Sequence, residues 1–144
     1  MDLVIEDLTA ADLKKGFLDA LASLADAGMT YDEAVKVFQS RLRAGHRTFV
    51  ARINDRVVGT TTLLLERKFI HHGSLVGHIE DVSVHKDFQR RGIGTALVKH
   101  ATEVAQEVGC YKVILGCFEN VAPFYKRLGY RNHDLGLRID LKQQ

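Results

Sequence analysis

The chain has 144 residues, of which 46% are hydrophobic and 26% charged, and its formal net charge is +2. This length favours one domain, 1–144, that buries roughly two thirds of the surface of its unfolded chain. Nucleic acid is not expected as a partner, because the charge is small and no basic stripe with interleaved aromatics accompanies it. The chain also lacks a signal-peptide start and any run of membrane-spanning length, which predicts a cytoplasmic protein without a membrane partner.

The predicted elements begin with a strand at residues 3–8, followed by a helix over 9–27 whose apolar positions recur at helical spacing. Thr30 and Glu33 stand three apart, as in a capping box, and open a second helix. The other predicted elements follow in order: strands at 48–53, 57–65 and 75–84, a helix over 92–108, a strand at 112–117 that is apolar enough for burial on both faces, a short helix over 121–128, and a last strand at 135–141.

The two cysteines, Cys110 and Cys117, lie around the predicted strand at 112–117 and do not have metal-ligand spacing. They are most simply interpreted as reduced core residues rather than as a disulfide or a site. No metal is implied.

The most informative segment is the junction between the strand ending at Val84 and the helix that follows it. There, Gln89-x-x-Gly92-x-Gly94 opens the helix, and such a junction directs free backbone N–H groups and the positive end of the helix dipole at one place, which suits a pyrophosphate. The motif is weak by itself, because glycine pairs at helix starts are common and it is neither a Walker A loop nor a full dinucleotide fingerprint.

The surroundings of this junction strengthen the interpretation. Arg90 and Arg91 add positive charge where phosphates would lie, and the preceding strand carries two adjacent carboxylates, Glu80 and Asp81. A phosphate cradle beside acid/base candidates indicates an enzyme that uses a phosphorylated carrier.

A second βα unit follows and ends in Phe124-Tyr125-x-x-x-Gly129-Tyr130. Taken together, strand, Gln-x-x-Gly-x-Gly, helix, strand and this last motif resemble the GCN5-related N-acetyltransferase (GNAT) superfamily, which binds acetyl-coenzyme A (acetyl-CoA). A narrower resemblance, to glucosamine-6-phosphate N-acetyltransferases, rests on residues 66–71, 77–84 and 109–115.

The resemblance implies an α/β (α+β) GNAT fold. This fold has a mixed, mostly antiparallel sheet of about six to seven strands flanked by helices, with two central parallel strands that splay apart, here 78–84 and 112–117. It further implies a homodimer in which the last strand and the region of residue 116 lie near the partner.

The resemblance assigns the cofactor to the splayed strand and the loop after it. The pantetheine arm would pair with the backbone of Val82, Ser83 and Val84, and the N–H of Val82 would polarise the thioester carbonyl. The N–H groups of 91–95 would hold the pyrophosphate, where glycines let the backbone come close. The loop residues assigned to the cofactor are Gln89, Arg90, Arg91, Gly92, Ile93, Gly94 and Thr95.

The resemblance makes Tyr125 the general acid for the departing thiolate, although spacing alone favours a core aromatic. Glu80 or Asp81 would accept a proton from the amine, and at most one of them faces the substrate unless a bulge intervenes. Asn120 either caps the short helix at 121–128 or contacts the cofactor.

On the substrate side, a basic cluster (Arg67, Lys68, His71 and His72) is either a solvated hairpin end or a contact for a sugar phosphate. Lys68 is the choice for a direct contact. Arg138 is offered as an arginine that reaches the site of a partner subunit from the last strand.

Three positions depart from the narrower pattern: Gly116 where an acid is usual, Ala25 where a hydroxyl is usual, and Asp140 near the expected place of the arginine. The resemblance implies transfer of the acetyl group of acetyl-CoA to D-glucosamine 6-phosphate, by direct attack in a ternary complex, in amino-sugar (UDP-GlcNAc precursor) metabolism. Two alternatives remain open: an acetyltransferase for another amine (another amino sugar, a polyamine or a protein amine), and a non-catalytic acetyl-CoA sensor.

Overall fold

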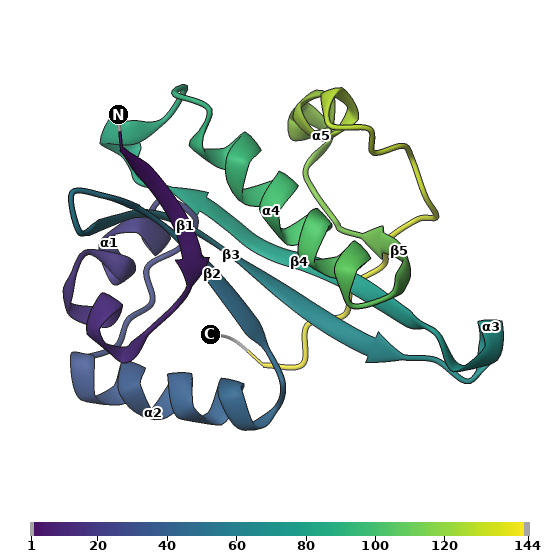
Figure 1. Ribbon diagram of the computed structural model, residues 1–144, viewed down its shortest axis with the longest axis horizontal. Helices are drawn as coiled ribbons and strands as arrows, with labels where there is room; N and C mark the ends of the chain where they lie inside the picture. The colour runs from purple at the N-terminus through teal and green to yellow at the C-terminus, as the bar shows by residue number, and fades with distance from the viewer. Residues whose placement is uncertain (1, 143–144) are drawn as a thin grey trace.

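A five-stranded sheet in the order β1-β2-β3-β4-β5 forms the centre of the computed structural model, which describes residues 2–142 (Figure 1). Neighbouring strands are antiparallel except β4 and β5, which are parallel. This confirms the mixed, mostly antiparallel α/β sheet, with five strands in place of the expected six to seven. The strands are β1 (Leu3–Asp7), β2 (Arg47–Ile53), β3 (Arg56–Arg67), β4 (Leu75–Val84) and β5 (Cys110–Ile114).

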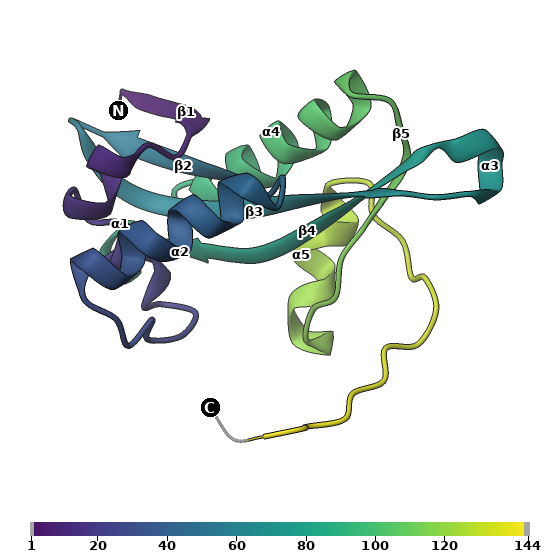
Figure 2. The ribbon, with the colours of Figure 1, turned by 90° about the horizontal axis from the view of Figure 1, so that it is seen from below.

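Helices cover both faces of the sheet (Figure 2). The long helix α4 packs on one face, where its apolar side meets a core that includes Phe49, Leu63 and Leu97. The segments α1 and α2 pack on the other face over a smaller core. The helical segments are η1 (Ala10–Lys14), α1 (Phe17–Leu21), α2 (Tyr31–Arg43), α3 (Ile70–Gly73), η2 (Lys86–Phe88), α4 (Ile93–Glu107), η3 (Glu119–Val121) and α5 (Ala122–Arg127).

The predicted helix over 9–27 is wrong in its length. The chain forms the 3-10 segment η1, turns at Gly16 and continues as the five-residue α1. Gly16 has φ +99°, and a Cβ on it would lie 2.9 Å from the carbonyl oxygen of Val57, so only glycine fits. The approach of β3 therefore breaks a segment whose own apolar spacing is helical.

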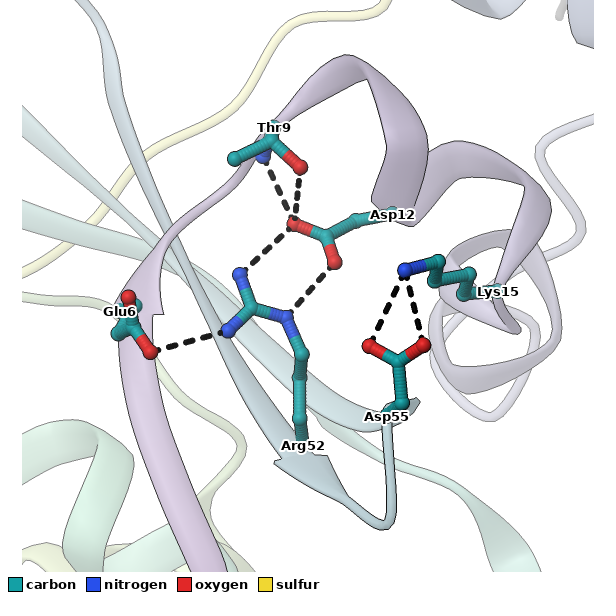
Figure 3. Close-up of polar contacts among 6 residues, drawn as sticks. All are labelled: Glu6, Thr9, Asp12, Lys15, Arg52 and Asp55. Atoms are coloured by element: carbon teal, nitrogen blue, oxygen red, sulfur yellow. Dashed lines mark hydrogen bonds and ion pairs between the residues drawn. The ribbon is translucent and has the colours of Figure 1, made fainter.

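A buried ion pair fastens η1 to the sheet (Figure 3). The Asp12 carboxylate, 2% exposed, accepts hydrogen bonds from Arg52 Nε at 2.7 Å and Nη2 at 3.1 Å, and from the Thr9 N–H and hydroxyl at 2.8 and 2.9 Å. Burial by itself raises the pKa of Asp12, but the hydrogen bonds from Arg52 and Thr9 outweigh it and leave the pKa below its usual value.

The predicted start of α2 is confirmed, because the Thr30 hydroxyl accepts a hydrogen bond from the N–H of Glu33 at 3.2 Å. Near the end of the helix, Arg41 Nη2 donates to the hydroxyls of Thr48 at 2.8 Å and Thr62 at 2.7 Å. These bonds fix α2 over β2 and β3.

The end of the sheet differs most from the prediction. β5 begins at Cys110, forms the edge of the sheet and is partly exposed, not buried on both faces. Of the two cysteines, which are both free, Cys117 is exposed and so not a core residue. In the described part of the chain, residues 135–141 belong to no strand, and Figure 2 shows this segment (yellow) leaving the body of the molecule.

Candidate active site

The two parallel strands separate part of the way along their length. β4 and β5 are paired from Leu75 with Cys110 to His78 with Ile114, where the pairing ends. Beyond His78, β4 continues for six residues beside β3 alone. The predicted splay is thus present, and it leaves one backbone edge of 79–84 facing a gap.

A β-bulge lies within this free part of β4. The register between β3 and β4 shifts between Thr60 and Thr62, and Asp81 takes a left-handed backbone conformation with φ +53°. The hydroxyl of the buried Thr61 donates to the Glu80 carbonyl at 3.1 Å and so holds the bulge. Because a bulge interrupts the alternation of side chains, the two neighbouring acids no longer need to point to opposite faces.

Glu80 lines an open cavity of about 780 Å³, whose other walls come from β4, the chain after β5, α5 and the tail that follows it. His78, Gly116, Cys117 and Tyr125 line the same cavity. A Cβ on Gly116 would meet nothing within 4 Å. The cavity therefore has open space at the position where an acid was expected and a glycine stands.

Tyr125 lies on α5 and is 8% exposed. Burial, with smaller contributions from Cys117 and Tyr130, raises the pKa of its phenol, so the hydroxyl keeps its proton at neutral pH and can donate it. Within residues 2–142 this hydroxyl has no hydrogen-bond partner, whereas the Tyr130 hydroxyl is bound to that of Thr102 at 2.7 Å. The Tyr125 hydroxyl is thus available to a ligand.

Asp81 opens on a different cavity, of about 130 Å³, between the sheet and the segments η1, α1 and α2. The walls of this cavity are mostly apolar, and Arg41 is the cation among them. Glu80 and Asp81 are consecutive in the chain, yet only Glu80 lines the same cavity as Tyr125.

The start of α4 has the features of an anion cradle. Its N-cap, Gly92, has φ +81°, and no side chain caps the helix, so the N–H groups of Ile93, Gly94 and Thr95 have no intrahelical acceptor. Arg90, with φ +63°, is a second left-handed residue in this loop.

This cradle adjoins the gap beside β4. A Cβ on Gly94 would lie 3.6 Å from the Phe124 ring of α5 and 3.7 Å from Val84 of β4. Gln89 Nε2 donates to the Val84 carbonyl at 3.1 Å, which ties the loop to the end of the strand. One elongated ligand could therefore reach both the cradle and the gap.

The remaining residues of the predicted cofactor site, on β4 and in η3, lie in different surroundings from one another. Val82 and Val84 are half-buried against the core under α4, while the Ser83 hydroxyl faces the other way and donates to the Ala20 carbonyl at 2.6 Å. Asn120 is exposed in η3 and caps neither η3 nor α5, so the capping interpretation is wrong.

Of the predicted substrate contacts, Glu80 lines the cavity of Tyr125, whereas Lys68 and Arg138 do not. Lys68 Nζ lies 3.0 Å from Glu66, and Arg138, 84% exposed on the tail, is paired with Asp140 at 2.7 Å. Sequence reasoning gave no role to His78, which lines that cavity and lies 2.9 Å from Glu66. The sequence held a signal that could have found it: His78 lies two residues before Glu80 on a strand, and residues two apart share a face.

Among residues 2–142, no helix has the length and apolar character to cross a membrane. In the same residues, histidine, cysteine and carboxylate side chains form no group of three or more that could hold a metal ion.

Comparison with known proteins places the chain in a family. The model of the acetyltransferase (GNAT) family matches residues 14–130. A glucosamine 6-phosphate N-acetyltransferase of Trypanosoma brucei brucei is 37% identical over 144 residues, covering 98% of this chain and 97% of its own. One of Candida albicans is 36% identical over 129 residues, covering 87% of each.

Solved structures agree. An acetyltransferase from Trypanosoma brucei superimposes with a TM-score of 0.90 at 37% identity, covering 97% of this chain and 100% of the other. The glucosamine-6-phosphate N-acetyltransferase of Arabidopsis thaliana gives 0.92 at 28% identity, covering 99% and 100%. From the family match over residues 14–130 and the relatives that align along nearly the whole chain, this protein belongs to the acetyltransferase (GNAT) family.

Proposed function

We propose that this chain, an acyltransferase by its family, transfers the acetyl group of acetyl-CoA to the amine of D-glucosamine 6-phosphate. One observation carries the proposal: Glu80 and Tyr125 line a single cavity beside the splayed strands. This cavity lies next to the N-terminus of α4, which no side chain caps. We further propose that the N-acetyltransferase domain spans 1–144. The sugar phosphate is the substrate that the names of the relatives from Trypanosoma and Candida give.

The cofactor residues follow from the cradle and the gap. The backbone of 82–84 would hold the pantetheine arm, and the N–H groups of 91–95 would hold the pyrophosphate. Gln89, Arg90 and Asn120 complete this proposed set. Acetyl-CoA supplies a thioester carbonyl carbon for attack and a thiolate that leaves.

Each proton in the proposed reaction has an acceptor or a donor. The ammonium group of the substrate gives a proton to Glu80, directly or through water, because only the neutral amine has the electron pair that forms the new C–N bond. The N–H of Val82 donates to the carbonyl oxygen as negative charge develops on it. Tyr125 donates its proton to the thiolate as the C–S bond breaks, and it recovers a proton from the nitrogen through solvent.

The tail supports a homodimer. Its large apolar side chains alternate along 135–141 and are all more than 80% exposed, so most of their surface is not covered by the described part of the chain (Leu135, Leu137, Ile139 and Leu141). β5 offers a free sheet edge. In a dimer, Arg138 and Lys68 would be the proposed contacts for the sugar phosphate.

The test is a panel of amines assayed for release of the coenzyme A thiol. We expect glucosamine 6-phosphate to be turned over with a kcat/KM at least about 10-fold above that of glucosamine, because its phosphate adds a charge-assisted contact. Polyamines and a lysine peptide are the controls.

Two other results of this assay would favour a different function. A better acceptor than glucosamine 6-phosphate would point to another amine, which the open space beside Gly116 favours. Tight binding of acetyl-CoA without turnover of any amine would point to a sensor of the cofactor.

A further inference from the structure

Two arginines meet at one aromatic ring beside the cradle of α4. The ring is that of Phe88, in η2, and the guanidinium carbons of Arg56 and Arg91 lie 5.3 and 5.2 Å from its centroid. Arg91 belongs to the loop that opens α4, whereas Arg56 is the first residue of β3, 35 residues earlier in the chain. Two guanidinium groups from different elements therefore lie against the same ring.

No carboxylate neutralises this pair. In residues 2–142 neither Arg56 nor Arg91 forms a salt bridge, although Arg47 and Arg52, on the strand next to β3, both do. The two acids nearest in sequence have other partners: Asp55, next to Arg56, lies 2.9 Å from Lys15 Nζ, and the Asp87 carboxylate lies 3.8 Å from His85 Nδ1. The two guanidinium groups on Phe88 thus leave an excess of positive charge around this ring, which an anionic ligand would neutralise.

His85 gives an independent sign that an acceptor belongs here. The histidine is 8% exposed, and two donors approach its ring: the Asp87 N–H at 3.1 Å from Nδ1 and Arg56 Nη2 at 3.2 Å from Nε2. A neutral imidazole has one acceptor nitrogen, and a protonated one has none. His85 is the N-cap of η2, and its Nδ1 accepts from the Asp87 N–H. Its Nε2 then carries the proton, so His85 Nε2–H and Arg56 Nη2 are two donors that face each other.

An anionic oxygen in front of these two donors would accept from both. The planar fork of an arginine suits a phosphate, whose dianion offers several such oxygens. The N–H groups at the start of α4 and Arg91 are already assigned to a pyrophosphate, and Arg56 reaches the same ring from a different element. This arrangement fits a ligand with one more phosphoryl group than a pyrophosphate.

We propose that Arg56, together with His85 Nε2–H, binds the 3′-phosphate of coenzyme A. The inference rests on the proposed function, because it deepens the same cofactor site. Arg56 then selects coenzyme A over carriers that lack this phosphate, while the pyrophosphate and the pantetheine arm are bound as described above.

The test compares coenzyme A with 3′-dephospho-coenzyme A by isothermal titration calorimetry. We expect the wild-type chain to bind coenzyme A about 10- to 100-fold more tightly, the range for one charge-assisted hydrogen-bonded contact. Arg56→Gln should bind both ligands with the affinity that the wild type has for the dephospho form. Arg56→Lys should keep part of the preference.

Arg47→Gln is the matched control, because Arg47 also begins a strand and its guanidinium carbon also lies 5.3 Å from a phenyl ring, that of Phe49. It should leave both affinities unchanged. Equal binding of the two ligands by the wild type would overturn the inference, as would an Arg56→Gln chain that loses affinity for both ligands alike. Failure to bind either ligand would instead overturn the proposed acetyl-CoA function itself, and this inference with it.

Discussion

The hydroxyl of Tyr125 is the group on which the proposed chemistry depends most directly. It is buried, it has no partner in residues 2–142, and burial raises its pKa above the ordinary value of 10.0. The phenol therefore stays protonated throughout the neutral range, which a general acid requires. For the same reason we expect no loss of kcat from its ionisation until the pH exceeds 10.0.

Tyr125→Phe keeps the ring and removes only this hydroxyl. We expect kcat to fall about 10- to 100-fold, at or just below the usual contribution of a general acid, with the affinity for coenzyme A nearly unchanged. Steady-state thiol release and calorimetry measure the two quantities. Tyr130→Phe is the control, because its hydroxyl is bound to Thr102 and its ring lies 6.0 Å from that of Tyr125. An unchanged kcat in Tyr125→Phe would remove Tyr125 from the mechanism.

Substitution also distinguishes the roles of the two adjacent acids, Glu80 and Asp81. Glu80→Gln should lower kcat/KM for the amine by about 100-fold, since Glu80 lines the cavity of Tyr125 and its loss removes the proton acceptor. Asp81→Asn should cost only a few-fold, because Asp81 lines the other cavity and asparagine tolerates its left-handed backbone. Amine saturation curves decide, and a larger loss in Asp81→Asn would exchange the two roles.

At the scale of elements, the two glycines at the start of α4 differ in what they provide. Gly92 is required by the backbone conformation, whereas Gly94 leaves space that a ligand could use. Gly92 has φ +81°, so an alanine there is strained by about 1 kcal/mol. Gly94 is helical, and its Cβ would make only ordinary contacts with Phe124 and Val84.

Gly94→Ala should therefore leave the free energy of unfolding unchanged or raise it by about 0.5 kcal/mol, the helix preference of alanine. It should nevertheless weaken coenzyme A binding about 10-fold, because the new methyl group fills the space between the cradle and the gap. Gly92→Ala should lower the free energy of unfolding. Urea unfolding and calorimetry test the pair, and full affinity in Gly94→Ala would show that no ligand passes between Phe124 and Val84.

The buried pair of Asp12 and Arg52 makes the attachment of η1 dependent on pH. The pKa of Asp12 is lower in the folded chain than in the unfolded one, so its contribution is complete above the unfolded value near 3.8 and is lost as the pH falls through the folded value. Asp12→Asn removes the buried carboxylate from Arg52, which is 16% exposed, and leaves it paired with the exposed Glu6 at 3.2 Å.

We expect Asp12→Asn to lower the free energy of unfolding by about 3 kcal/mol at neutral pH, with a difference from the wild type that shrinks as the pH falls below 3.8. Urea unfolding at neutral pH and across the acid range measures this. Asp55→Asn is matched to it, because Asp55 is paired with Lys15 on the surface and should cost below about 1 kcal/mol. Equal losses in the two variants would mean that the Asp12 pair is no stronger than a surface pair.

Sequence reasoning was sufficient where the signal is local, and it failed where distant segments meet. The alternation of apolar residues located β4 residue for residue, and the helical spacing located α4 to within a residue at each end. The bulge at Asp81 depends on a hydroxyl from β3, and the break at Gly16 depends on a carbonyl of the same strand. The stacking of Arg56 on Phe88 likewise brings together two segments that no local pattern connects.

The tail is a place where an alternating pattern predicted a strand and the described residues form none. Residues 135–141 alternate as a strand does, yet the described residues offer them nothing to pair with, and their four large apolar side chains are 81–89% exposed. A surface of this kind on a small protein indicates an interface. The opposite side of the same segment carries Arg138 and Asp140, which are paired with each other.

The double variant Leu137→Glu, Ile139→Glu tests whether a second copy covers that surface. By sedimentation velocity at micromolar concentration we expect the wild type to be a dimer and the variant a monomer, because two carboxylates cannot be buried in an apolar interface without a large penalty. Lys142→Glu, on the other side of the segment, should remain dimeric. If Arg138 acts across the dimer, the monomeric variant loses kcat/KM for glucosamine 6-phosphate but keeps that for glucosamine. A monomeric wild type with full activity would instead show that the site is complete within one chain.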